Sequence, residues 1–353
     1  MRYFCTALDQ NSLIRGVALH RSLSDHAGEF ELVVLCLDES VADFLGRSAL
    51  SQVRPLSLME LLKRHPRLAG ARTDRTPAEF HLTCVPWLLS HLLAQLPRGA
   101  LLTYVDASVF LFASPAPVFD EIGEASVALL PYRFPPGLTY LERHGKFSAS
   151  WISLRHDSTG ETCATEWAEK CAEWCFLLFE ATRYGSQKYL DAWPARFPGT
   201  VVLTHPGANL GPWNLKDAAL TAGKPGLRVN KRPLISFDFR DLADVGQNLY
   251  DPGLHAYDAA LTPVLRDQIY RPYLRQLHAG AATGETAPDL LPAGQANDPR
   301  HYLAVGFLLA KLGPAERERG TAMAAMEKIR RTAGAAVQDA RLEAKEAQEV
   351  VFV

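Results

Sequence analysis

The sequence predicts an α/β protein in which a mostly parallel central sheet is flanked by helices. Runs of β-prone residues alternate with helix-like stretches from the first residues onward, which is the pattern of strand–helix–strand units. One run, Glu31–Leu37, is almost continuously apolar, as expected of a strand that is covered on both faces. With 353 residues and a hydrophobic content of 48%, the chain can bury the large core of one such domain.

The first half of the chain contributes strands and helices in alternation. Arg2–Leu8 is a short β-prone run, and a helix-like stretch follows from Ser12 to about Leu23. A later helical pattern contains Pro86, which should kink or break the helix because proline lacks the amide hydrogen and its ring clashes with the preceding turn. Around Glu31–Leu37 we further predict helices at Val41–Leu50, Leu58–Arg64 and Ala78–Leu96, and strands at Val53–Leu56, Ala100–Val105 and Val127–Pro131.

The second half is less regular. A helix is predicted over Gly160–Leu178, where Trp167, Cys171, Trp174 and Cys175 share one face that we interpret as core packing. The remaining predicted elements are a short helix at Gly185–Trp193 and strands at Thr200–Thr204 and Leu234–Phe239.

A change of composition near the C-terminus divides the chain. Residues 281–300 are rich in Ala, Gly, Pro and Thr and are typical of a loop or linker. Helical patterns follow at His301–Leu312 and Thr321–Gln348, and the second can dock on the domain or join two copies in a homo-oligomer. We therefore predict a ligand-binding domain over residues 1–280, a linker over 281–300 and a helical segment over 301–353.

Composition and charge exclude several classes of protein. Lys+Arg (37) and Asp+Glu (39) nearly cancel, so we expect no nucleic-acid partner. The N-terminus lacks the pattern of a signal peptide, and no apolar run reaches the roughly 20 residues of a membrane-spanning helix. Six cysteines without a Cys-x-x-Cys pair favour reduced, buried thiols. We expect a cytoplasmic protein, either free or peripheral at the inner face of the membrane.

Two acidic residues directly follow predicted strands. Asp9 comes after the first strand, and Asp106 comes after Ala100–Val105. Ligands bind beyond the carboxyl ends of parallel strands, so each carboxylate can hold a cation or a ribose hydroxyl there. The alternative for each is an aspartate that caps a helix or closes a turn, and position alone leaves both interpretations open.

Several segments together resemble the GT-A glycosyltransferases, in particular bacterial sugar transferases similar to family 8. Leu101–Phe119 is similar to their strand that ends in Asp-x-Asp and continues into an apolar strand and a Ser-Pro turn. His205–Trp213 (HPGANLGPW) is similar to the motif His-x-x-Gly-x-x-Lys-Pro-Trp, with His, Pro and Trp in register. Gly145–Arg155 and Gly185–Pro194 resemble the acceptor-side and Asp-Gln segments. The resemblance covers roughly residues 3–275 and implies a GT-A-like, Rossmann-like fold.

The resemblance also implies a reaction and a set of site residues. A sugar would pass from a nucleoside diphosphate sugar, with a UDP-sugar favoured, to a glycan or lipid-linked acceptor such as a cell-surface polysaccharide. A divalent cation, Mn²⁺ or Mg²⁺, would neutralise the leaving diphosphate, with Asp106, Ser108 and His205 as its ligands. Ser186 and Gln187 would be the catalytic residues. The implied nucleotide-sugar contacts are Thr6, Ala7, Leu8, Asp9, Arg75, Asp106, Ser108, Lys146, Ser148, Gln187, Lys188, Asn209 and Trp213, with Lys216 as a further cation for the diphosphate.

The sequence also departs from the family's motifs. Ser108 stands at the second Asp of Asp-x-Asp, Ser186 stands at the Asp of Asp-Gln, and Gly211 stands at the motif's Lys. Because a neutral hydroxyl is a poorer cation ligand than a carboxylate, the cation would be weakly held or dispensable. Two alternatives stay open. One is a catalytically degenerate relative that binds a nucleotide or glycan as a partner protein. The other is an unrelated α/β enzyme such as a nucleotidyltransferase, although no GxxxxGK[ST] or GxGxxG loop is present.

Overall fold

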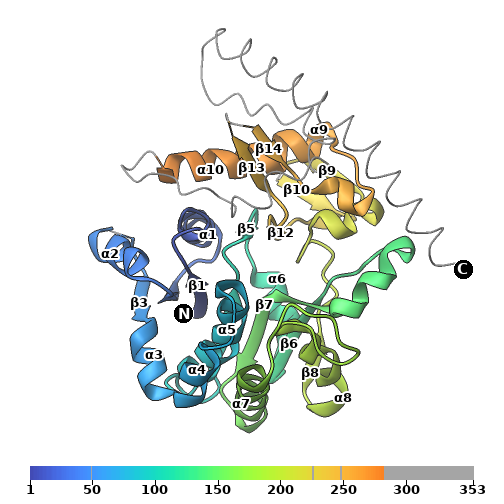
Figure 1. Ribbon diagram of the computed structural model, residues 1–353. Helices are drawn as coiled ribbons and strands as arrows, with labels where there is room; N and C mark the ends of the chain where they lie inside the picture. The colour runs from blue at the N-terminus through green and yellow to red at the C-terminus, as the bar shows by residue number, and fades with distance from the viewer. Residues whose placement is uncertain (49, 225, 247–248, 282–353) are drawn as a thin grey trace, which may run out of the picture. The chain divides into compact units, whose positions relative to one another are not determined.

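The computed structural model describes residues 1–48, 50–224, 226–246 and 249–281 (Figure 1). These residues fall into two compact units, of which the first is Met1–Asp238 and the second begins at Phe239. The predicted C-terminal helices, and all but the first residue of the predicted linker, lie outside the described residues.

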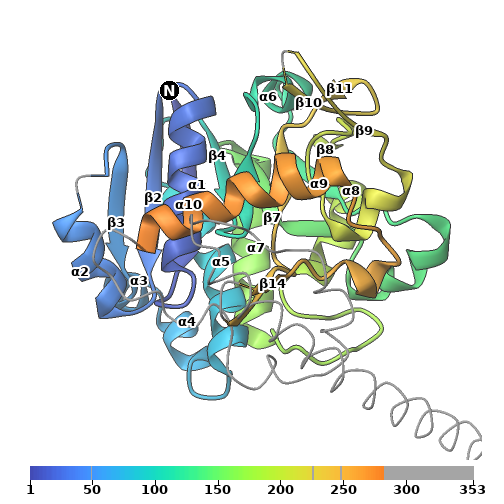
Figure 2. The ribbon, with the colours of Figure 1, turned by 90° about the horizontal axis from the view of Figure 1, so that it is seen from above.

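A seven-stranded sheet forms the centre of the first unit, in the order β3-β2-β1-β4-β7-β6-β8. Strands β1, β2, β3 and β4 are parallel neighbours (Figures 1 and 2), and β6 pairs in parallel with β8. Strand β7 runs antiparallel to both β4 and β6. The strands span Arg2–Leu8 (β1), Phe30–Cys36 (β2), Val53–Ser57 (β3), Leu101–Val105 (β4), Val127–Pro131 (β6), Phe147–Arg155 (β7) and Thr200–Val202 (β8).

Helices cover both faces of this sheet, and the side chains of β1 show why. Successive residues of a strand point to opposite faces, so Cys5 packs in the core with α3, α5 and α7, whereas Phe4 packs in the core with α1, α2 and α6. This arrangement confirms the predicted fold class. The α-helices are α1 (Leu13–His26), α2 (Glu39–Arg47), α3 (Leu58–Arg64), α4 (Pro66–Ala71), α5 (Pro77–Leu93), α6 (Ala116–Ile122), α7 (Ser158–Glu173) and α8 (Trp193–Arg196). The first unit also contains the 3-10 helices η1 (Pro136–His144), η2 (Gln187–Ala192) and η3 (Pro212–Asp217).

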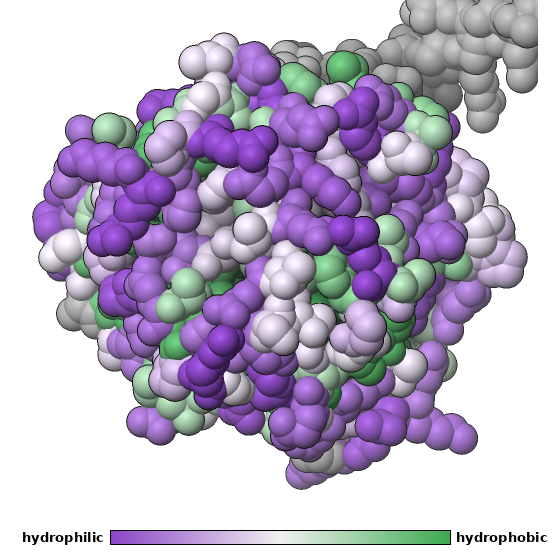
Figure 3. All heavy atoms as spheres, turned by 90° about the horizontal axis from the view of Figure 1, so that it is seen from below, coloured by the Kyte–Doolittle hydropathy of each residue, from purple (hydrophilic) through white to green (hydrophobic). Residues whose placement is uncertain are grey.

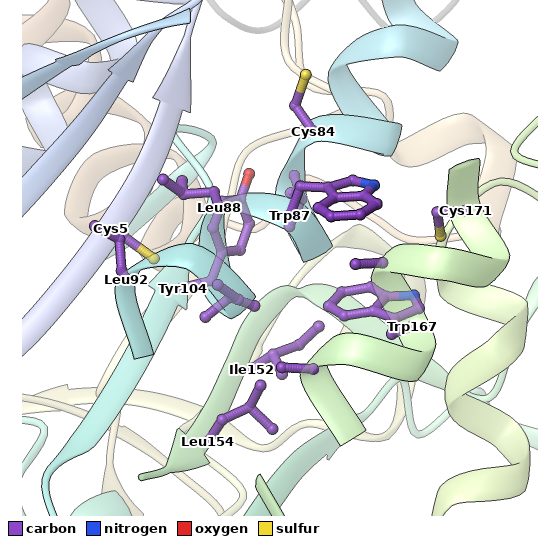
Figure 4. Packing of buried hydrophobic residues seen from close by; sticks show 14 of the residues in the cluster. Cys5, Cys84, Trp87, Leu88, Leu92, Tyr104, Ile152, Leu154, Trp167 and Cys171 are labelled. Atoms are coloured by element: carbon purple, nitrogen blue, oxygen red, sulfur yellow. The ribbon is translucent and has the colours of Figure 1, made fainter. Parts of the chain in front are cut away.

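The larger core lies between the sheet and α5 and α7. Figure 4 shows Trp87 from α5 and Trp167 from α7 beside Tyr104 of β4 and Ile152 of β7, all of them buried. Cys171 belongs to the same core, as the predicted apolar face of this helix requires. Figure 3 shows that the surface seen from below is mostly hydrophilic, with smaller hydrophobic areas between the polar side chains.

Two helices differ from their predictions, α5 in its interior and α7 at its end. Helix α5 continues across Pro86, so of the predicted kink or break the break does not occur. A capping box of Thr76 and Glu79 starts the helix, and both its faces are packed. Helix α7 ends at Glu173, earlier than the predicted Leu178. The chain leaves the helix there because a side chain of α5 captures the next segment: Glu79 Oε1 accepts a hydrogen bond of 2.9 Å from the amide of Leu177.

Smaller elements follow the central sheet. Strand β5 (Val109–Leu111) pairs antiparallel with β12 (Ser236–Asp238), and β9 (Leu220–Gly223), β10 (Gly226–Val229) and β11 (Arg232–Pro233) form a separate sheet. The second unit contains β13 (Ala243–Gly246), β14 (Leu249–Asp251), η4 (Leu254–Tyr257), α9 (Pro263–Leu265), a π-helix η5 (Arg266–Tyr270) and α10 (Arg271–Ala281). Its interior includes Phe239 stacked on Tyr273, with ring centroids 3.8 Å apart. Over the described ranges, no helix is both long and apolar enough to span a bilayer.

Candidate active site

Several loops meet at the carboxyl edge of the central sheet. Asp106 follows β4, Tyr132 follows β6, and the loop that carries His205 follows β8. Strand β7 begins at the same edge because it runs antiparallel, and its first residues lie between the ends of β4 and β6. Ligands of open α/β sheets bind at this edge, so it is the candidate site.

Asp106 opens a tight turn between β4 and β5. Its Oδ1 accepts hydrogen bonds from the backbone nitrogen and the Oγ of Ser108, at 2.9 and 2.7 Å, and its Oδ2 accepts one from the Tyr104 hydroxyl at 3.2 Å. The Asp106 amide donates to the carbonyl of Ser150 on β7 at 2.9 Å. Ser108 therefore supports the Asp106 carboxylate, which is half-buried and remains partly open to solvent.

A second carboxylate, Asp238, lies beside this turn. Strand β12 places it opposite Val109 of β5, and its Oδ2 accepts a hydrogen bond of 2.6 Å from the Oγ of Ser150. The Oγ of Ser148 in turn donates to the Oγ of Ser150 at 3.1 Å. Asp238 is only 1% exposed. Ser150 thus contacts both acidic residues, Asp106 through its carbonyl and Asp238 through its hydroxyl.

Sequence reasoning missed Asp238, although a signal was present. A strand was predicted over Leu234–Phe239, and its pattern places one carboxylate among apolar residues. A buried carboxylate requires hydrogen-bonding partners, so such a residue marks a polar contact in the interior. Its partner on β7 lies far away in the sequence and could not be predicted from the local pattern.

The loop after β8 is held by two charged side chains. Glu121 of α6 accepts hydrogen bonds from the nitrogen and Oγ1 of Thr204, at 2.6 and 2.5 Å, and from the nitrogen of His205 at 3.1 Å. Burial by itself raises the pKa of Glu121, but these bonds bring it below its ordinary value. From the other side, Nη2 of Arg133 donates to the carbonyls of Pro206, Ala208 and Asn209.

His205 is buried in this loop, with 4% of its surface exposed. Its Nδ1 accepts a hydrogen bond of 3.2 Å from the Gly207 amide. Burial lowers the pKa of His205, as do the charges of Arg232 and Arg133, while Glu121 opposes them. The imidazole is therefore neutral at pH 7 and carries its proton on Nε2. That nitrogen has no hydrogen-bond partner among the described residues, and neither has Nη1 of Arg133, so His205 and the arginine that holds its loop each have an enclosed, unpaired donor.

Gln187 lies at the start of η2, next to the end of β6. Its Oε1 accepts a hydrogen bond from the Tyr132 hydroxyl at 3.3 Å, and its Nε2 donates to the carbonyl of His144 at 2.9 Å. The Tyr132 ring also packs edge-on against Trp213, at 5.2 Å between centroids. The structure therefore brings the predicted catalytic Gln187 and the predicted motif residue Trp213 onto one tyrosine. Ser186, beside them, is buried, and its carbonyl accepts a hydrogen bond from the Trp167 indole at 2.9 Å.

The predicted nucleotide segment lies at the carboxyl end of β1. Thr6, Ala7 and Leu8 are buried, and the Oγ1 of Thr6 lacks a hydrogen-bond partner within the described chain. The Oδ1 of Asp9 accepts hydrogen bonds from the nitrogen and Oγ of Ser12, at 2.8 and 2.6 Å. Asp9 thus closes the turn before α1, and its contact with a nucleotide stays a prediction.

The predicted cationic residues fall into separate places. Lys188 Nζ donates to the carbonyl of Glu142 and pairs with Asp191, both at 2.9 Å, and the amide of the exposed Lys146 donates to the same aspartate at 2.7 Å. Arg75 is buried elsewhere, where it stacks on the ring of Phe176 at 3.9 Å. Lys216 lies on η3. The last predicted contact, Asn209, donates from Nδ2 to the Pro131 carbonyl at 3.1 Å.

Ligation of a cation by Asp106, Ser108 and His205 stays a prediction, since Ser108 donates its hydroxyl hydrogen to Asp106 and His205 accepts a hydrogen bond at Nδ1. Across the ranges described, no three His, Cys, Asp or Glu side chains gather as a group that could hold a metal ion. His205 would need to move its proton to Nδ1, and so lose the Gly207 hydrogen bond, before Nε2 could bind a cation. The present tautomer instead suits an anion, because it offers an N–H group.

Two proteins of Bacillus subtilis (strain 168) are similar to this chain in sequence. The uncharacterized protein YfnF is 30% identical over 220 residues, which cover 60% of this chain and 71% of YfnF. The chain belongs to the family of YfnF. The uncharacterized protein YfnD is 26% identical over 278 residues, which cover 78% of this chain and 88% of YfnD. No family model matches the chain.

Solved structures similar to this chain include glycosyltransferases. The galactosyltransferase LgtC in complex with donor and acceptor sugar analogs has a TM-score of 0.46 and 15% identity, over 81% of this chain and 97% of LgtC. The apo form of mouse xyloside xylosyltransferase 1 has a TM-score of 0.38 and 11% identity, over 57% of this chain and 84% of that chain. The glycosyltransferase GlyE of Streptococcus pneumoniae TIGR4 has a TM-score of 0.38 and 13% identity, over 61% of this chain and 48% of that chain.

Proposed function

We propose that the chain is a glycosyltransferase, which binds a nucleoside diphosphate sugar at the carboxyl edge of its central sheet. A UDP-sugar is the favoured donor, and a glycan or lipid-linked acceptor of bacterial cell-surface polysaccharide is the favoured acceptor. One observation carries the proposal: the Asp106 turn, Gln187 and the loop of His205 come from three distant parts of the sequence and adjoin the same sheet edge. This edge is where α/β sheets of this kind bind nucleotides.

The proposed reaction develops negative charge on the leaving diphosphate, and hydrogen-bond donors of the chain can stabilise this charge. The bond between the sugar C1 and the β-phosphate oxygen breaks, and the oxygen keeps the electron pair. The acceptor hydroxyl oxygen forms the new bond to C1 and releases its proton. The β-phosphate then carries added negative charge, and hydrogen-bond donors placed beside it lower the barrier.

The loop of His205 and the adjoining Arg133 offer such donors. The Nε2–H group of His205 and an N–H group of Arg133 are unpaired among the described residues. Leaving a buried donor unpaired costs about 1–3 kcal/mol, and an anion that bound there would remove this cost. Both atoms are enclosed, so we propose that the loop shifts when the diphosphate binds.

In this proposal Gln187 positions the transferred sugar or the acceptor. Its side-chain amide has one hydrogen bond at each end, to Tyr132 and to the His144 carbonyl, and this fixes its orientation. A fixed amide can hold a sugar hydroxyl or the acceptor close to C1 without further loss of conformational freedom. A divalent cation would neutralise the same diphosphate charge, but the donors described here do not require one, and we propose that it is dispensable.

A second candidate is a protein that binds a nucleotide or glycan and does not catalyse transfer. The observation that favours it is the presence of neutral Ser108 and Ser186 where the resembling family carries aspartates. Release of a nucleoside diphosphate in the presence of an acceptor extract separates the two candidates, because only the enzyme accumulates this product.

Isothermal titration calorimetry with UDP-, GDP- and dTDP-sugars, each with and without manganese, tests the proposal. We expect binding of at least one donor, with little dependence on manganese. Asp106→Asn keeps the shape of the turn and removes its charge, whereas Asp43→Asn removes an exposed charge from α2 and serves as the control. A change in donor affinity for the first variant alone supports the site. Absence of binding to every donor, or equal affinities for both variants, contradicts it.

A further inference from the structure

Exposed apolar side chains gather on one loop of the first unit. Leu177, Leu178 and Phe179 are consecutive and are 44%, 65% and 56% exposed. Tyr140, on η1, is 58% exposed. Over the part of the chain that the structure describes, the other large hydrophobic side chains in this class are Met1 and Met59. Four of the six such residues therefore belong to this loop and to η1, whose Arg143 and His144 both contact the Phe179 ring. A group of this kind marks an interaction surface.

The loop is a hairpin that is closed by backbone hydrogen bonds, and these bonds fix the backbone from which the exposed side chains project. The Gly185 amide donates to the Phe176 carbonyl at 2.9 Å, which closes the base of the loop. Near the tip, Glu180 and Arg183 exchange two backbone hydrogen bonds, at 3.0 and 3.4 Å. The amide of Leu177 is tied to Glu79 at 2.9 Å. We call residues 176–185 the apolar hairpin.

The inner side chains of the apolar hairpin are anchored to the protein. The guanidinium of Arg75 lies 3.9 Å from the centroid of the Phe176 ring, and it donates to the carbonyls of Ala172 and Glu173 at 3.3 Å. The guanidinium of Arg183 lies 4.7 Å over the Trp174 ring. These contacts hold the base of the hairpin against the first unit, while Leu177, Leu178 and Phe179 are exposed to solvent.

Cationic side chains accompany these apolar groups. Arg143 lies over the Phe179 ring, 5.7 Å from its centroid, and both Arg143 and Lys146 are exposed. Neither makes an ion pair with another described residue, whereas Arg183 is paired with Glu180. Apolar side chains that enter the lipid boundary, next to cations at the headgroup level, are the combination that binds anionic bilayers.

We propose that the apolar hairpin and Tyr140 form a membrane-docking surface for an anionic lipid bilayer. The surface adjoins the candidate active site through His144. Its ring packs on Phe179, at 6.2 Å between centroids, and its carbonyl accepts the hydrogen bond from Gln187. Docking would therefore present the Gln187 side of the site to an acceptor that is attached to a membrane lipid. This last step rests on the proposed function, while the docking itself does not.

Vesicle co-sedimentation of the full chain tests the docking surface. The probes are vesicles of phosphatidylglycerol mixed with phosphatidylcholine and vesicles of phosphatidylcholine alone. We expect the wild-type chain to bind the anionic vesicles and the double variant Leu178→Ser/Phe179→Ser to bind at least about tenfold more weakly, since each apolar side chain contributes through its buried area. Met59→Ser removes a 56% exposed side chain from α3 and should bind like the wild type. Arg143→Gln should weaken binding to the anionic vesicles only.

Several outcomes would overturn this inference. They are a wild-type chain that does not sediment with anionic vesicles, equal binding by the double variant, and an equal loss in Met59→Ser. A dimer in sedimentation velocity that the double variant dissociates would assign the surface to a second copy of the chain instead. Calorimetry with nucleotide sugars on the same samples reports separately on the proposed function, so the failure of one is distinguishable from the failure of the other.

Discussion

Gly211 offers the sharpest test of how the loop after β8 is packed. This glycine stands at the lysine of the resembling motif, and it faces the indole of Trp213. A methyl group on Gly211 would lie 2.4, 2.6 and 2.7 Å from Cη2, Cζ2 and Cζ3 of that ring. These separations are too short for carbon atoms, so either the ring or the backbone must move.

The size of the effect follows from how little room Trp213 has. Its side chain is buried, and its ring already packs against Tyr132. Overpacking of an interior costs about 1–3 kcal/mol, and three close contacts on a rigid ring place Gly211→Ala near 2–3 kcal/mol. For a unit of this size we expect the melting temperature to fall by about 4–12 °C. Because Tyr132 also holds Gln187, donor affinity should fall as well.

Thermal melting followed by circular dichroism, tryptophan fluorescence and donor calorimetry would measure these changes. Gly46→Ala is the matched control: Gly46 lies in α2, and among the described residues no atom outside its chain neighbours and its own helix backbone lies within 4 Å of the added methyl group. It should raise the free energy of unfolding by about 0.5–1 kcal/mol, because glycine is a poor helix residue. If Gly211→Ala melts at the wild-type temperature with an unchanged fluorescence spectrum, the packing of Trp213 described here is wrong.

Three further predictions concern the interior and the site. Asp238→Asn removes the charge from a buried hydrogen-bond acceptor and should lower the free energy of unfolding in urea by about 1–3 kcal/mol; an unchanged midpoint would contradict its role. Tyr132→Phe removes the hydroxyl that donates a hydrogen bond to Gln187. In calorimetry, the affinity for the nucleotide sugar should fall about two- to tenfold, without a large change in the melting temperature. An unchanged affinity for the nucleotide sugar would show that this contact does not belong to the site. His65 and His91 lie 3.2 Å apart between ring nitrogens, and burial lowers the pKa of both, so the unfolded chain takes up protons first. Urea unfolding should therefore show stability falling as the pH drops below about 6.5, and a His91→Phe variant with the same slope would argue against this pair as the cause.

The local sequence pattern predicted the bounds of a helix or strand correctly where no contact with a distant residue changed them. The strand at Val127–Pro131 and the helix at Leu58–Arg64 have the predicted bounds, because each carries its own apolar spacing and end signals. Of the kink or break predicted at Pro86, the break was wrong, since packing on both faces holds α5 together across this residue. The end of α7 was also wrong, because a carboxylate from α5 captures the chain after Glu173.

The candidate site divides in the same way. Asp106 and His205 could be singled out from the sequence because each ends a strand or starts a recognisable motif, and both features are local. The contacts of Asp238 with Ser150, and of Arg133 with the loop of His205, exist only in the folded chain. Strand pairing and loop docking join residues that are far apart in sequence, and neither leaves a periodic trace in either partner. The residue order of this protein therefore determines its layers and its strand ends, and the three-dimensional packing decides which side chains meet there.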